Sequence, residues 1–137
     1  MNEQDVMVML KNQRRYKAEI IIMRDCSDQL SDIDSSDSSH RCALLNRRLK
    51  LINQWLYMLP GEERVVVQQH LIEGWTWVRI ATEFERENNN EIPCDIRTLQ
   101  RAQTRALKRL VDFTNASFRT SLDFLVDPSI EIPVEET

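Results

Sequence analysis

A chain of 137 residues has room for one modest domain, or for a small domain with an arm. Its composition, 42% hydrophobic and 29% charged with a net charge of -4, is ordinary for a globular protein, and two glycines favour an all-α fold over a turn-rich β architecture. No apolar run is long enough to span a bilayer, and the N-terminal MNEQDVMVMLKNQRRY lacks the basic start and continuous apolar stretch of a secretory signal. We therefore expect a cytoplasmic protein that does not contact a membrane.

The cysteines and histidines do not form a recognisable catalytic or metal-binding pattern. Cys26, Cys42 and Cys94 are odd in number and lack CxxC spacing, which favours reduced, mostly buried thiols. A metal site built on His40 and Cys42 would need a distant third ligand, and the usual ligand spacing is not met. The chain also lacks a His-acid-nucleophile set and a glycine loop that could cradle phosphate. We expect no metal, no cofactor and no enzymatic activity.

Residues 1–26 are expected to form an amphipathic helix. Its apolar stripe consists of Met9, Tyr16, Ile20 and Met23. The basic residues largely outside that stripe are Lys11, Arg14, Arg15 and Lys17. Two interpretations remain open: the helix packs on the rest of the domain, or it is a coiled-coil arm that makes a homodimer.

Residues 27–40, SDQLSDIDSSDSSH, contain six serines and four aspartates and are predicted to be an acidic linker. From Arg41 the pattern becomes helical again and opens a helical domain over residues 41–111. Its first apolar seam, with alternating steps of four and three, consists of Leu45, Leu49, Ile52, Leu56 and Leu59.

Two shorter helices are predicted next. Pro60 suits the start of a helix that runs to about residue 73 and stops at Gly74. Thr76 is then the N-cap of a helix that ends near residue 87. The apolar face of this second helix consists of Trp77, Ile80, Ala81 and Phe84. We expect Trp77 to be buried between this helix and the following one.

The helix predicted over residues 95–111 has one apolar and one basic face. Its apolar positions are Leu99, Ala102, Ala106 and Leu110, and the opposite positions are Arg97, Arg101, Thr104 and Lys108. Five basic residues against one acid give this segment a charge of +4 in a protein whose total is -4. Asp95 is the expected N-cap, and Cys94 can pack on Leu99 as a hydrophobic staple.

Residues 112–137 are predicted to be an acidic C-terminal extension. Six acids against Arg119 give this segment a charge of -5, and Pro128 and Pro133 favour an extended end. The extension either lies near the basic helix and competes for it with a negatively charged partner, or is a solubilising end without contacts.

The run LPGEERVVVQQHLIEGWTWVRIATEF, followed by IRTLQRAQTRALKRL, resembles the region 4 helix-turn-helix of sigma-70-type factors. It is similar above all to the small phage and prophage regulators of the ArpU and RinA type. The resemblance covers about residues 59–111 and implies a helix-turn-helix there. It matches Trp77, Ile80 and Ala81 to the core of the supporting helix, and Thr98, Leu99, Arg101 and Arg105 to the recognition helix. The connection at residues 88–94 is longer than the family's usual short turn.

These features together predict a sequence-specific regulator of transcription that binds double-stranded DNA, in phage or prophage late genes. The expected base-reading residues on the recognition helix are Arg97, Gln100, Arg101 and Thr104, with Thr98 beside them. The expected phosphate-binding residues are Arg105 and Lys108, together with Thr76 and Arg79 at the start of the supporting helix. The alternative is an adaptor that binds RNA polymerase and does not itself read DNA.

Overall fold

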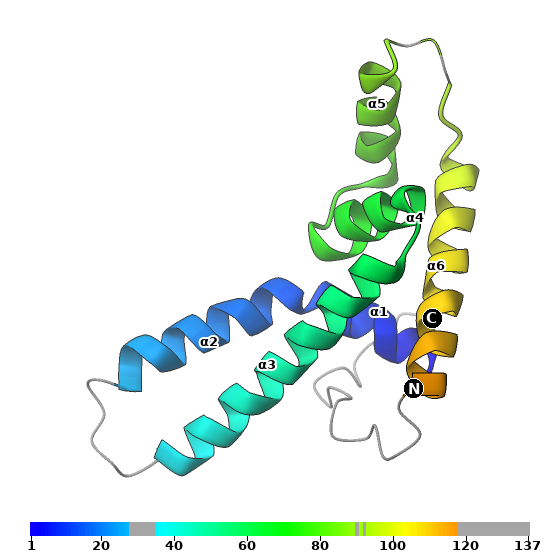
Figure 1. Ribbon diagram of the computed structural model, residues 1–137. Coiled ribbons are helices and arrows are strands. Elements are labelled where there is room, and N and C mark those ends of the chain that lie inside the picture. The colour runs from blue at the N-terminus through cyan, green and yellow to red at the C-terminus, as the bar shows by residue number, and fades with distance from the viewer. Residues whose placement is uncertain (28–34, 90, 92, 118–137) are drawn as a thin grey trace, which may run out of the picture.

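A computed structural model describes residues 1–27, 35–89, 91 and 93–117 of the chain. Within these ranges every regular element is helical, as the composition predicts. In Figure 1, α2 and α3 form a hairpin that extends away from α6, and α4 and α5 lie between the hairpin and the upper part of α6. The elements are α1 (Glu3–Lys11), α2 (Gln13–Ser27), α3 (Ser35–Met58), α4 (Gly61–Val66), the π-helical η2 (Val67–Ile72), α5 (Trp77–Glu87) and α6 (Ile96–Ser117).

The N-terminal segment is two helices, whereas the sequence pattern predicts one. Helix α1 starts with a capping box, in which Asp5 N donates to Asn2 Oδ1 and Asn2 N donates to Asp5 Oδ2. It ends at Asn12, whose φ of -95° and ψ of 4° depart from helical geometry. The break changes the direction of the chain, so α1 packs on α6 and η2 while α2 packs on α3.

Helix α3 begins six residues earlier than the predicted linker allows. Residues 28–34 lie outside the described part of the chain, but residues 35–40 belong to α3. Serine and aspartate are favourable in a first helical turn because they can bond free amides and complement the helix dipole. At the C-terminal end of α3, the Nη2 atom of Arg64, a residue of α4, donates to the carbonyl oxygens of Tyr57 and Leu59, each at 3.0 Å.

The predicted start and stop signals of the following helices act at the predicted residues, although the helix predicted up to residue 73 is divided into α4 and η2. Pro60 precedes the first turn of α4, and Gly74, with a φ of +75°, ends the π-helical stretch η2. Thr76 is the N-cap of α5, since its Oγ1 accepts from Arg79 N at 3.2 Å. Asp95 Oδ1 accepts from Arg97 N at 3.0 Å at the start of α6.

Helix α6 continues six residues beyond the predicted end at Val111 and so includes the first part of the predicted acidic extension. The end of α6 is tied to the main core: the buried Thr114 donates to Leu110 O and accepts from Trp55 Nε1, both at 2.7 Å. Residues 118–137 lie outside the described part of the chain, so the hypothesis about the acidic tail stays a prediction.

The main hydrophobic core joins α1, α2, α3, η2 and the C-terminal half of α6. Trp55 is its largest fully buried side chain. The core also contains a buried cation, because Arg48 of α3 is 1% exposed and its guanidinium carbon lies 5.3 Å from the centre of the Tyr16 ring. Arg48 lies off the apolar seam predicted for this helix, but it is buried because the start of α2, with Tyr16, covers that side of α3.

A second, smaller cluster joins α4 and α5 to the N-terminal half of α6. Its buried residues are Val66, Ile80, Ala81, Leu99 and Ala102. Trp77 is only half-buried at its edge, so the prediction of full burial is wrong: the ring stacks on His70 of η2, with centroids 3.7 Å apart. Phe84, also expected on the apolar face, is 39% exposed, because the C-terminal end of α5 extends beyond the start of α6 (Figure 1).

None of the helices in the described ranges is long and apolar enough to cross a membrane.

Candidate nucleic-acid interface

The outer face of α6 is exposed and basic. Its exposed side chains are Arg97, Gln100, Arg101, Thr104 and Lys108. No acid in the described part of the chain forms an ion pair with Arg97, Arg101 or Lys108. Thr104 donates its hydroxyl to Gln100 O at 3.0 Å, which leaves its oxygen lone pairs facing solvent. Within the described ranges, the face therefore offers several charged donors that no internal acid pairs with.

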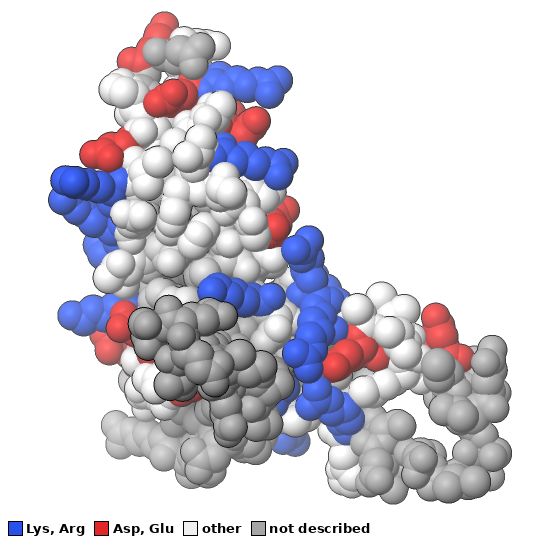
Figure 2. Space-filling model, turned by 180° about the vertical axis from the view of Figure 1, so that it is seen from behind, with Lys and Arg blue, Asp and Glu red and all other residues white. Residues whose placement is uncertain are grey.

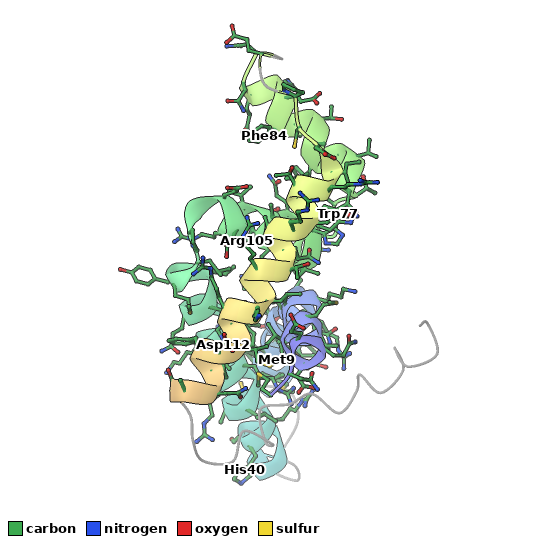
Figure 3. All side chains as sticks on the ribbon, turned by 90° about the vertical axis from the view of Figure 1, so that its right-hand side faces the viewer. Met9, His40, Trp77, Phe84, Arg105 and Asp112 are labelled. Atoms are coloured by element: carbon green, nitrogen blue, oxygen red, sulfur yellow. The ribbon has the colours of Figure 1, made fainter. Side chains whose placement is uncertain are left out.

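Arg105 differs from the other predicted site residues because it is directed toward α4. Glu63 is 5% exposed and lies between two arginines of α6, with Oε2 3.8 Å from Arg105 Nε and Oε1 3.1 Å from Arg109 Nε. A buried carboxylate requires such positive partners. In Figure 3, Arg105 lies on the side of α6 that faces α4, while Trp77 lies on the opposite side. Arg105 therefore helps to hold α4 against α6. The sequence pattern predicts only a phosphate contact for this residue.

Thr98 also lies off the outer face. It lines a groove between α4, α5 and the start of α6, together with Val65, Ile80 and Phe84. The groove has a volume of about 460 Å³ and is mainly apolar. Its rim carries the acidic residues Glu62, Glu83, Glu87 and Asp95. Thr98 is thus placed for contacts at the groove rather than beside Arg101.

Thr76 and Arg79, both exposed, lie together at the start of α5. The guanidinium carbon of Arg79 is 3.8 Å from the centre of the Trp75 ring. Stacking on an indole holds a guanidinium in place without neutralising its charge. Arg79 can therefore donate its N–H groups to an anion that lies at the start of α5.

His70 links three elements on the side of α6 opposite to Glu63. Its ring stacks on Trp77 of α5, and its Nδ1 lies 2.6 Å from Gln103 Oε1 of α6. Burial lowers the pKa of His70 below its ordinary value, and the charge of Lys11 acts in the same direction, while the hydrogen bond with Gln103 opposes the shift. Lys11 is the last residue of α1, a helix that packs on η2, which carries His70.

The partly buried position of His70 between Trp77 and Gln103 should make the free energy of unfolding depend on pH. Above the unfolded-state pKa of about 6.5 His70 is neutral in both states. Below it, the unfolded chain takes up a proton before the folded protein does, so the free energy of unfolding should fall as pH decreases from about 6.5 toward the lower folded-state pKa. Urea melts between pH 7.5 and 5 on the parent protein and on His70→Gln should show that this variant loses part of the decrease. An equal decrease in both proteins would contradict the assignment.

The long connection between α5 and α6 is tied to α5 at both ends. Asn88 Nδ2 donates to Phe84 O at 2.8 Å, and Asn89 has a φ of 55°, the left-handed conformation that often follows a helix. Cys94 N donates to Glu85 Oε1 at 3.0 Å just before α6 begins. Burial raises the pKa of the Cys94 thiol, and nearby carboxylates act in the same direction, so the thiol is a poor nucleophile.

Within the described ranges, no three His, Cys, Asp or Glu side chains come together as a metal site. No family model, curated protein or solved structure matches the chain.

Two parts of the site could not be predicted from sequence periodicity. The Glu63 pair with α6 and the His70 contacts with Trp77 and Gln103 both join residues that are far apart in the chain. The only sequence signal for Glu63 is an acid at a helix start, where it would ordinarily be read as complementing the dipole.

Proposed function

We propose that this protein is a sequence-specific DNA-binding regulator of transcription that inserts α6 into the major groove. The observation that carries the proposal is the exposed face with Arg97, Arg101 and Lys108, which have no acidic partner in the described part of the chain. A single helix fits the major groove, and arginine and glutamine can form paired hydrogen bonds with guanine and adenine there. The resemblance of residues 59–111 to ArpU and RinA regulators adds the proposal that the target genes are phage or prophage late genes.

The contacts divide by position. Arg97, Gln100, Arg101 and Thr104 lie on the N-terminal half of the outer face and are the proposed base readers, with Thr98 at the margin. Lys108, one to two turns farther along α6, is the proposed phosphate contact. At the start of α5, Thr76 and Arg79 are proposed to bind the sugar-phosphate backbone. Arg105 remains a phosphate contact only to the extent that its half-exposed guanidinium can leave Glu63.

A second candidate function is an adaptor that binds RNA polymerase, and the groove beside Thr98 favours it. The groove is apolar, is bordered by four acidic residues and contains the exposed Val65 and Phe84. This surface would suit an apolar segment of the polymerase with basic flanks, because opposite charges at the rim orient such a partner. Both functions are compatible, since the groove and the outer face of α6 do not share the base-reading residues.

The deciding experiment compares substitutions on the two surfaces. The target is first selected from random duplexes, and affinities are then measured on that duplex and on a scrambled one at several salt concentrations. Arg101→Ala should cost about 1–3 kcal/mol on the selected duplex and reduce sequence preference, whereas Lys108→Ala should weaken both duplexes evenly and lower the salt slope by about one. Both side chains are exposed, so neither change should alter the thermal midpoint.

Phe84→Asn, in the groove, is the matched control for this comparison. It should leave DNA affinity unchanged if α6 is the reader. If Arg101→Ala and Lys108→Ala bind DNA like the parent, and Phe84→Asn loses binding to purified RNA polymerase, the adaptor function replaces the DNA-reading one.

A further inference from the structure

The junction of α1 and α2 is the most basic segment outside α6. Residues 11–17, KNQRRYK, contain four basic residues and no acid. The exposed basic side chains of this segment are Lys11, Arg14, Arg15 and Lys17. Arg15 pairs with Glu19 at 3.6 Å, whereas the ion pairs found in the described part of the chain do not include the other three. The segment thus retains uncompensated positive charge.

The position of Lys11 relates this charge to α6. Helix α1, which ends at Lys11, packs on α6 and on η2, the element that carries His70. His70 in turn contacts Gln103 of α6 and Trp77 at the start of α5. Lys11 therefore lies on the same side of α6 as the start of α5, which carries Thr76 and Arg79.

The views from two directions agree with this arrangement. In Figure 3, Trp77 and Met9 of α1 lie on the same side of α6, opposite to Arg105 and α4. Figure 2, seen from behind, shows basic side chains along the edge formed by α6 and a second group toward the α2–α3 hairpin.

A helix in the major groove has a phosphate strand on each side, because the groove is only about 12 Å wide. Cations that flank such a helix can therefore reach phosphates without touching bases. On the α4 side of α6, the arginines pair with Glu63. Lys11, the last residue of α1, and Arg14, in the first turn of α2, are exposed and have no acidic partner in the described ranges.

We propose that Lys11 and Arg14 form a phosphate-binding flank, which contacts the DNA backbone on the His70 side of the groove that α6 enters. The inference rests on the proposed DNA-binding function and assigns the N-terminal helices to the same interface. It gives the break at Asn12 a functional role, because α1 packs on α6 and Arg14 follows directly after the end of α1. These contacts depend on the charge of the phosphates and not on the base sequence.

The test is the salt dependence of DNA binding by Lys11→Gln and by Lys11→Gln/Arg14→Gln. Each lost phosphate contact should reduce the slope of log K against log salt by about 0.9, so the double variant should lose about 1.8. The loss of affinity should be equal on selected and scrambled duplexes. Lys50→Gln removes one exposed charge from α3 and is the matched control, for which the slope should stay that of the parent.

The outcomes separate this inference from the function on which it rests. If Arg101→Ala loses sequence preference while Lys11→Gln/Arg14→Gln keeps the parental slope, the flank is wrong and the DNA-reading function stands. If Lys50→Gln reduced the slope of log K against log salt as much as Lys11→Gln does, the proposed flank would also be wrong, because the change would then reflect net charge alone. If the parent protein binds no duplex at low salt, both proposals fail.

Discussion

Replacing Trp55 by alanine should lower the free energy of unfolding by about 3–5 kcal/mol, as large aromatic truncations in cores do. Trp55 is fully buried and lies in the main core, where α3 meets α6. Its Nε1 donates to Thr114 Oγ1 at 2.7 Å, so the substitution removes both packing and a buried hydrogen bond between two helices. Denaturant melts followed by far-ultraviolet circular dichroism measure the loss.

Thr114→Val separates the two contributions. Valine has a similar volume but leaves the buried indole N–H without an acceptor, which should cost about 1–3 kcal/mol. The remaining part of the Trp55→Ala effect is packing. A Trp55→Ala variant as stable as the parent would show that α3 and α6 do not share this core.

The sequence predicts helix boundaries well where one residue has a local reason to start or stop a helix. Pro60, Gly74, Thr76 and Asp95 all have the predicted local roles, because a fixed φ, a left-handed φ or a capping oxygen acts over one turn. The break at Asn12 was missed since asparagine in a polar stretch carries no comparable signal, and the break depends on the docking of α1 on α6.

Burial was predicted less well than helicity for the same physical reason. Periodicity predicts the apolar face of each helix, but it does not predict which neighbouring helix covers that face or over how much of its length. Arg48 is buried by α2, and Phe84 stays partly exposed because α5 extends beyond the start of α6 (Figure 1). Trp77 stacks on His70 of η2 and is only half-buried at the edge of the small cluster.

For the candidate site, the periodicity of α6 was sufficient to predict Arg97, Arg101 and Lys108 on one exposed face. It could not assign Arg105 to Glu63, because that pairing depends on how α4 packs against α6. The helices that carry the proposed DNA contacts are therefore also held by ion pairs and stacking at their edges. Their stability need not match that of the main core.

Leu99→Ala is expected to show that difference. The small cluster contains Val66, Ile80, Ala81, Leu99 and Ala102, and two of these side chains are only methyl groups. Leu99 and Ile80 are therefore the larger buried side chains that α6 and α5 contribute to this cluster. Removing the Leu99 side chain should lower the free energy of opening this cluster by about 2–5 kcal/mol.

Hydrogen exchange in the native state can locate the effect. Amides of α5 should lose protection in Leu99→Ala, while amides of α2 and α3 keep theirs, because those helices pack in the main core. DNA affinity should fall with α5 protection, since Thr76 and Arg79 depend on the position of that helix. Val65→Ala, at an exposed position of α4, is the control and should leave protection unchanged. Equal loss of protection in α3 and α5 would mean that the two clusters open as one unit, and that DNA binding is coupled to the whole fold.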